Sequence, residues 1–104
     1  MQQIKLLLET LGLPVRENRY LGVMPLPCII YSDDIEMGGG DLSNNVITHN
    51  IGVELYSEKI DRINEEKLES LLDVMPNKYT RIRDWIESEK FFLTQYEFSI
   101  IERK

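Results

Sequence analysis

Strict alternation of side chains over nine residues restricts the fold of this chain more than any other feature. Residues suited to burial occupy every second position and are separated by polar residues or glycine: Ile47, His49, Ile51, Val53 and Leu55. Successive side chains of a β-strand point to opposite faces, so this period of two predicts a strand with one buried face. The buried face needs a covering layer, and two helical segments are available to supply it.

The two segments have the spacing of amphipathic helices. Residues 2–11 repeat leucine and isoleucine at helical spacing, and Gly12 followed by Pro14 ends that helix. The second helix has Asp61 as its expected N-cap and stops at Pro76. We expect it to pack against the sheet through an apolar stripe formed by Ile60, Ile63, Leu68, Leu71, Leu72 and Met75.

Three further strands are predicted, at residues 26–33, 79–88 and 91–102. The last two are separated only by Glu89 and Lys90, so we expect an antiparallel hairpin. The even-numbered face of the last strand is expected in the core, with Phe92, Thr94, Tyr96, Phe98 and Ile100.

The resulting order is helix, strand, strand, helix, strand, strand. This order predicts an α+β fold, with an antiparallel four-stranded sheet and two helices packed on one face. A chain of 104 residues is long enough for one hydrophobic core, and we expect a single α+β domain over residues 1–104.

A segment rich in turn formers separates the first two strands. Its glycines, asparagines and aspartates do not fix their own backbone, so we expect a mobile hairpin loop at about 35–45. We take this loop as the candidate contact site of the protein, made of Ile35, Glu36, Met37, Gly38, Gly39, Gly40, Asp41, Leu42, Ser43, Asn44 and Asn45.

Charge and composition limit the partners. Eighteen acidic and twelve basic residues give a formal charge of -6, which repels phosphate backbones, so we expect no sequence-specific nucleic-acid partner. No run approaches the ~20 apolar residues of a membrane span, and the start lacks the pattern of a signal peptide. We therefore expect no membrane partner and a reducing cytoplasm, where Cys28, the one cysteine, is a buried small hydrophobe.

Three kinds of chemistry have candidate residues in this sequence, and each has a simpler interpretation. A Cys28–His49 nucleophilic pair needs the two side chains to face each other, but both lie in apolar patterns. The three glycines at 38–40 lack the Lys-Ser/Thr of a phosphate loop. A cation site in the acidic segment lacks the ligand spacing of an EF-hand; its candidate ligands are Asp33, Asp34, Glu36 and Asp41. The sequence therefore favours a protein that is not an enzyme, with no catalytic residues, cofactor or metal.

The second helix is rich in acidic residues, namely Glu58, Glu65, Glu66, Glu69 and Asp73. A solvated face is the simpler interpretation of such a run. The alternative is a negative surface that lines a channel or meets a basic partner.

Three segments together carry a family resemblance: LPCIIY at 26–31, VELYSEK at 53–59, and WIESEK at 85–90 running into YEF at 96–98. In this order and spacing the chain resembles the small tail-completion or tail-terminator (head-tail joining) proteins of long-tailed bacteriophages and prophages of Gram-positive bacteria. The resemblance spans roughly residues 4–101.

The resemblance implies a structural virion-assembly protein. Such a subunit forms a ring with copies of itself, six when assembled, caps the tail tube, and docks to the head connector. Its partners are then itself, the tail-tube protein and the head connector. It acts in the bacterial host cytoplasm during assembly and ends in the virion, at the head-proximal end of the tail. An acidic channel in the ring lets DNA slide without binding.

Two alternatives stay open. The chain is also compatible with a small monomeric regulatory or ligand-binding α+β domain, such as an antitoxin-like or host-takeover protein. A hydrolase is the third interpretation, although no pair of carboxylates stands out from the sequence.

Overall fold

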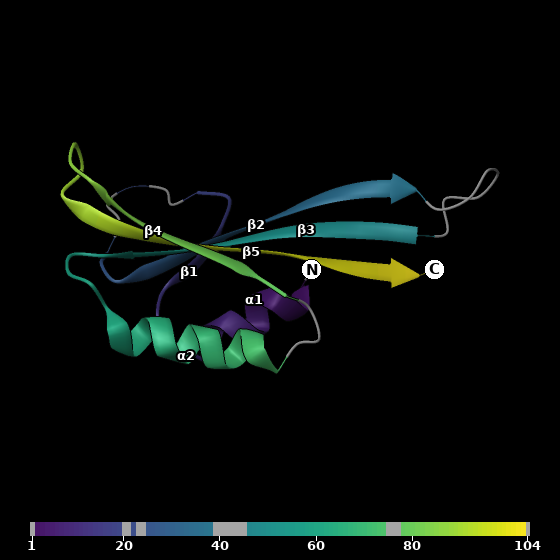
Figure 1. Cartoon of the computed structure of the whole chain (residues 1–104), viewed down its shortest axis with the longest axis horizontal. Coiled ribbons are helices and arrows are strands. Elements are labelled where there is room, and N and C mark those ends of the chain that lie inside the picture. Colours follow the sequence, from purple (N-terminus) through teal and green to yellow (C-terminus); the bar gives the residue numbers. More distant parts are fainter. Residues whose placement is uncertain (1, 20–21, 23–24, 39–45, 75–77, 104) are drawn as a thin grey trace.

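A computed structural model describes residues 2–19, 22, 25–38, 46–74 and 78–103 of the chain. It has two layers, a β-sheet and a pair of helices that both lie on one face of the sheet (Figure 1). In chain order the elements are α1 (Gln2–Glu9), β1 (Val15–Glu17), β2 (Cys28–Gly38), β3 (Val46–Ser57), α2 (Arg62–Asp73), β4 (Thr80–Ile86) and β5 (Phe91–Arg103). The predicted α+β class is therefore confirmed.

The sheet is five-stranded and mixed, with the order β1-β2-β3-β5-β4. The prediction of a four-stranded antiparallel sheet is wrong in one strand, because β1 joins the edge of β2 in parallel. Backbone bonds fix this short pairing: the Ile29 amide donates to the Pro14 carbonyl at 2.8 Å, and the Asn18 amide donates to the Tyr31 carbonyl at 2.7 Å. Three residues are too few to show a strand period, so the sequence pattern does not reveal β1.

The core lies between the sheet and the helices. Ile51, Val53 and Leu55 of β3 are at most 2% exposed, which confirms the period-two prediction. Thr94, Tyr96 and Phe98 confirm the buried even-numbered face of β5. The helices add Ile4, Leu8, Leu68 and Leu72, and β2 adds Ile29 and Tyr31. Each fully buried large apolar side chain contributes about 1.5–3 kcal/mol to stability.

Helix α2 begins as predicted but buries a different set of residues. The Asp61 carboxylate accepts a hydrogen bond from the Asn64 amide at 3.1 Å, which confirms the N-cap. Ile60 and Ile63, by contrast, are 48% and 69% exposed, and Glu65 is buried on the sheet side. The predicted apolar stripe is therefore wrong over its first turn, since Glu65 occupies the position that faces β4 and β5.

The boundaries of β2 also differ from the prediction. Residues 34–38 were expected to leave the first strand and enter a loop, but β2 continues to Gly38, which pairs with Val46 of β3. Residue-by-residue pairing with β3 satisfies the backbone of this segment and overrides the local turn preference. Glycines 39 and 40 and residues 41–45 lie outside the described residues.

The C-terminal hairpin follows the prediction closely. Strands β4 and β5 pair antiparallel, with Ile86 opposite Phe91. The Lys90 amide closes the turn by donating to the Ile86 carbonyl at 2.8 Å, and Lys90 takes a positive φ of 58°.

Candidate functional site

Strands β2, β3 and β5 continue past the helix layer and form an arm, defined here as residues 35–38, 46–50 and 99–103 (Figure 1). The 13 residues of β5 span about 43 Å, whereas the 12 residues of α2 span only about 18 Å. The long strands therefore extend beyond the helices that pack against them. The arm is the part of the molecule that reaches farthest from the core.

Both outer edges of the arm are open. Strand β1 pairs with β2 only at residues 29–31, and β4 pairs with β5 only up to Glu97. Within the described residues, neither 32–38 of β2 nor 98–103 of β5 has a partner strand on its outer side. Open strand edges present unpaired backbone groups that are able to bind another chain.

The arm holds the first part of the predicted contact loop. Ile35 is 56% exposed although it lies on the helix side of the sheet, opposite His49. Glu36 accepts a hydrogen bond from the Asn50 amide group at 3.0 Å. Met37 and Gly38 continue the strand, so the contact candidates 35–38 belong to a paired strand and not to a loop.

The second surface is the sheet face turned away from the helices, called here the open face. Its described strand side chains include five carboxylates: Asp34, Glu36, Glu54, Asp84 and Glu97. Arg16 is the one basic residue among the described strand side chains of this face, and together these side chains carry a net of four negative charges. Two large apolar side chains on the same face, Ile82 and Ile101, are 56% and 63% exposed. The face therefore combines charge with exposed apolar area.

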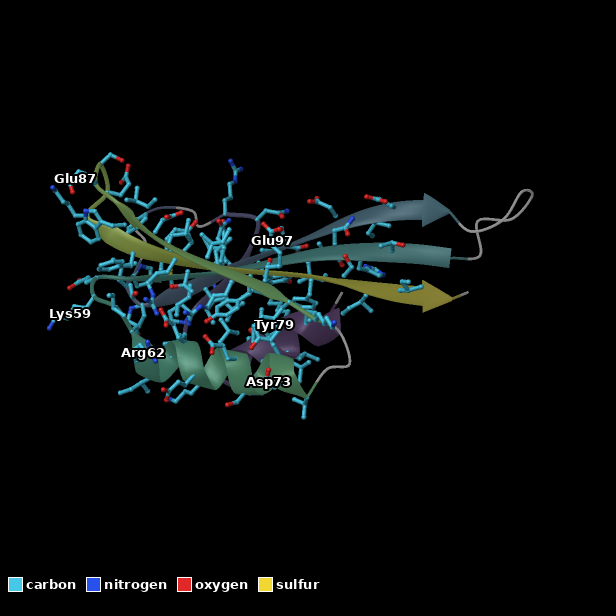
Figure 2. All side chains as sticks on the ribbon, viewed as in Figure 1. Lys59, Arg62, Asp73, Tyr79, Glu87 and Glu97 are labelled. Atoms are coloured by element: carbon cyan, nitrogen blue, oxygen red, sulfur yellow. The ribbon has the colours of Figure 1, made fainter. Side chains whose placement is uncertain are left out.

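Hydrogen bonds hold two of these carboxylates in place, Glu36 through Asn50 and Glu54 through two partners. Glu54 accepts from the Tyr56 hydroxyl at 3.0 Å and from the Gln95 amide group at 3.1 Å. Asp34 and Glu97 accept no hydrogen bond within the described part of the chain, so their charges are available to a partner. Figure 2 shows Glu97 on the side of the sheet opposite α2.

A hollow of about 580 Å³ opens on this face around Gly52. Gly52 lies between Ser32 of β2 and Glu97 of β5, and its missing side chain leaves a gap in that row. A Cβ placed there would lie 3.1 Å from the Ser32 hydroxyl oxygen. Asp34, Glu54 and Glu97 border the gap, so the hollow is suited to a cation.

A third feature joins α2 to the sheet through Glu65. Arg83 binds this carboxylate with two hydrogen bonds, of 2.8 and 2.5 Å, and the Thr94 hydroxyl donates a third at 3.1 Å. Burial opposes ionisation of Glu65, but the hydrogen bonds from Arg83 and Thr94 and the positive charges of Arg83 and Arg81 outweigh it and lower the pKa of Glu65. The group is a buried, compensated charge.

This network changes the interpretation of the acidic helix. Glu65 is buried, Glu69 binds Arg81 and the Tyr96 hydroxyl, and Asp73 binds the Tyr79 hydroxyl. Glu65 and Glu69 are therefore engaged on the sheet side, so a solvated acidic face is wrong for these two, whereas Asp73 is exposed and makes its bond at the surface.

The exposed residues of the first half of the helix and of the turn before it are weakly basic, whereas Asp73, which is also exposed, lies at the other end of the helix. The helix surface, as named here, consists of Glu58, Lys59, Arg62, Ile63, Glu66 and Lys67. It has three cations and two carboxylates, and Ile63 is its exposed apolar centre. Figure 2 places Lys59 and Arg62 at the same end of α2.

The structure separates Cys28 from His49. Cys28 pairs with Tyr56 and His49 pairs with Ile35, so the two residues are seven positions apart along the strands, about 23 Å. They also lie on opposite faces of the sheet. Burial raises the pKa of the Cys28 thiol to about 11, which disfavours a nucleophilic thiolate.

His49 instead pairs with Asp33, whose carboxylate oxygens lie 2.9 and 3.0 Å from Nδ1. Burial alone would raise the pKa of Asp33, but hydrogen bonds and positive charge, those of His49 included, outweigh it and lower the pKa.

The predicted acidic ligands do not come together. Asp33 lies on the helix side of the sheet, Asp34 and Glu36 lie on the open face, and Asp41 is outside the described residues. The described residues contain no group of three His, Cys, Asp or Glu side chains that could hold a metal ion.

Two comparisons of the sequence with known proteins give no match. No protein-family model matches the chain, and no curated protein matches it. In the part of the chain that the structure describes, no helix has the length and apolar character needed to cross a membrane.

Proposed function

We propose that this chain is a structural virion-assembly protein, the subunit of a phage tail terminator or head-tail joining ring. It self-associates into a ring of six copies, caps the tail tube and docks to the head connector. It acts in the bacterial host cytoplasm during assembly and remains in the virion at the head-proximal end of the tail. The sequence resemblance suggests this role, and the projecting arm is the structural observation that supports it best.

The arm has the properties of a docking element. It extends past the helix layer, both of its outer strand edges are open within the described residues, and Ile35 exposes apolar area on it. A monomer with no large partner gains nothing from such a feature and has to limit aggregation through it. A subunit that meets both a tube and a connector needs a rigid element that reaches beyond its own core.

The acidity of the chain agrees with the same role. A formal charge of -6 disfavours tight binding to duplex DNA. A ring through which DNA passes benefits from repulsion, because the duplex then moves without adhering to the wall.

Solution mass is the first test. Light scattering over a concentration series, followed by negative-stain imaging of the largest species, is expected to give closed rings near six subunits. Purified tail tubes are added in a parallel series, because the tube is the expected template. A chain that stays monomeric in both series contradicts the proposal.

The arm is tested by tube binding. Ile35→Lys should reduce co-sedimentation with tail tubes, whereas Leu6→Lys should not, since Leu6 is 61% exposed on α1 and lies outside the arm. Equal co-sedimentation of the two variants would show that the arm is not part of the surface that docks to the tube.

A further inference from the structure

We infer that the open face of one subunit binds the helix surface of the next copy, with its acidic hollow receiving a basic side chain of α2. This contact rests on the proposed ring and names the two surfaces that would build it. It commits to a second copy of this chain as the occupant of the open face.

The open face exposes apolar side chains that a solvated sheet face does not require. Antiparallel sheets commonly expose one polar face to water, and an acidic face alone fits that pattern. Ile82 and Ile101, however, are more than half exposed on the same face. Ile82 lies diagonally across from Glu97, which pairs with Thr80, whereas Ile101 lies four residues farther along β5. An exposed apolar side chain beside an unpaired carboxylate is typical of a surface that another protein covers.

The helix surface is complementary in both respects. Lys67 is exposed one helical turn after Ile63, so a cation and an isoleucine stand side by side on α2. Lys59 and Arg62 add positive charge at the same end of the helix. This surface therefore offers a cation for the carboxylates and apolar area for the isoleucines of the open face.

The hollow explains where a long basic side chain would fit. Its volume of about 580 Å³ leaves room for a lysine or arginine above Gly52. Asp34 and Glu97 stand beside that position and accept no hydrogen bond from described residues. A cation placed between them gains charge-assisted hydrogen bonds without displacing an existing pair.

The placement of the two surfaces determines the symmetry. The helices lie on one face of the sheet and the open face is the other, so the surfaces point to opposite sides of the subunit (Figure 1). Two copies related by a twofold axis cannot satisfy this contact in both directions. The contact is therefore head-to-tail, and it closes into a ring if the rotation between copies allows.

Charge-neutralising variants measure the contact. Glu97→Gln on the open face and Lys67→Gln on the helix surface should each raise the concentration for half-assembly by about tenfold. Glu89→Gln at the hairpin turn and Lys78→Gln before β4 make the same charge changes on exposed residues outside both surfaces. These controls should assemble like the wild type.

Charge reversal with mixing provides the decisive experiment. Glu97→Lys and Lys67→Glu should each leave the folded chain monomeric, as checked by circular dichroism and light scattering. An equimolar mixture of the two should restore rings, because each variant then meets a partner of opposite charge on both sides.

Each other outcome overturns the inference. If both variants form rings like the wild type, the ring stands but its contact lies elsewhere. Rings of Glu97→Lys that now retain duplex DNA place the open face in the channel. Folded monomers that do not assemble on mixing also contradict the contact. A wild-type chain that never assembles, even with tail tubes, overturns the contact and the proposed function together.

Discussion

The two faces of the sheet both contain carboxylates, but they hold them in opposite ways. On the covered face, Glu65 is 1% exposed and is bound by Arg83 and Thr94. On the open face, Glu97 is exposed and accepts no hydrogen bond from the described residues. The first arrangement fixes α2 on the sheet, whereas the second leaves charge free for a partner. Glu65 therefore acts on stability, whereas Glu97 is a carboxylate that we propose to act in binding.

The largest effect should come from removing the partner of Glu65. Arg83→Met leaves a buried carboxylate without its two strongest hydrogen bonds, so we expect a loss of about 3–5 kcal/mol in the free energy of unfolding. Urea denaturation measures this loss. Arg81→Met is the matched control, because the Arg81 side chain is 37% exposed against 21% for Arg83 and its closer bond is to Glu69, so this substitution should cost at most about 1 kcal/mol. Similar losses for both variants would show that the buried pair has no special role.

Acid should also lower the free energy of unfolding, but by less than Arg83→Met does. Protonation neutralises Glu65, whereas Arg83→Met leaves its charge buried without a partner. The pKa of Glu65 is lowered by folding, so its contribution is present above the unfolded pKa of about 4.3 and is lost as pH falls through the folded value. The wild type should therefore lose more stability than Glu65→Gln between pH 6 and pH 3. If the free energy of unfolding falls equally with pH in both proteins, Glu65 is not the group responsible.

A methyl group in the hollow tests the open face with a smaller effect. Gly52→Ala brings a Cβ to 3.1 Å from the Ser32 hydroxyl, which has to shift slightly, while the backbone becomes less free in the unfolded chain. These effects oppose each other, and we expect a net change below about 1 kcal/mol. Assembly should weaken if the hollow receives a side chain. Thermal unfolding and light scattering measure the two properties on the same samples.

The covered face was only partly predictable from the sequence. The period of two in β3 and the even-numbered face of β5 correctly identified the core of the sheet. Glu65 was missed because acidic residues are common on exposed helix faces. The available signal was its position three residues before Leu68 and seven before Leu72, on the stripe that faces the sheet. Arg81 and Arg83, alternating on β4, were the other half of that signal.

The open face and the arm could not be predicted from the sequence, because both are formed by pairing between strands that are distant in the chain. The polar members of β3 were predicted to share a face, but their neighbours on β2 and β5 follow from the register, which the sequence does not show. The glycine-rich segment was predicted to be a loop from residue 35. Pairing with β3 extends β2 to Gly38 instead, and that extension supplies one of the three strand segments of the arm.

The smallest effect on stability should come from Glu97→Gln. Its side chain is exposed and makes no hydrogen bond in the described part of the chain, so unfolding should change by less than about 0.5 kcal/mol. The same substitution at Glu65 keeps the shape but removes the charge that Arg83 requires, and it should cost several times more. Denaturation of the two variants side by side measures the contrast directly. A loss at Glu97 as large as that at Glu65 would mean that the open face stabilises the monomer, and its carboxylates would then no longer be free for a second subunit.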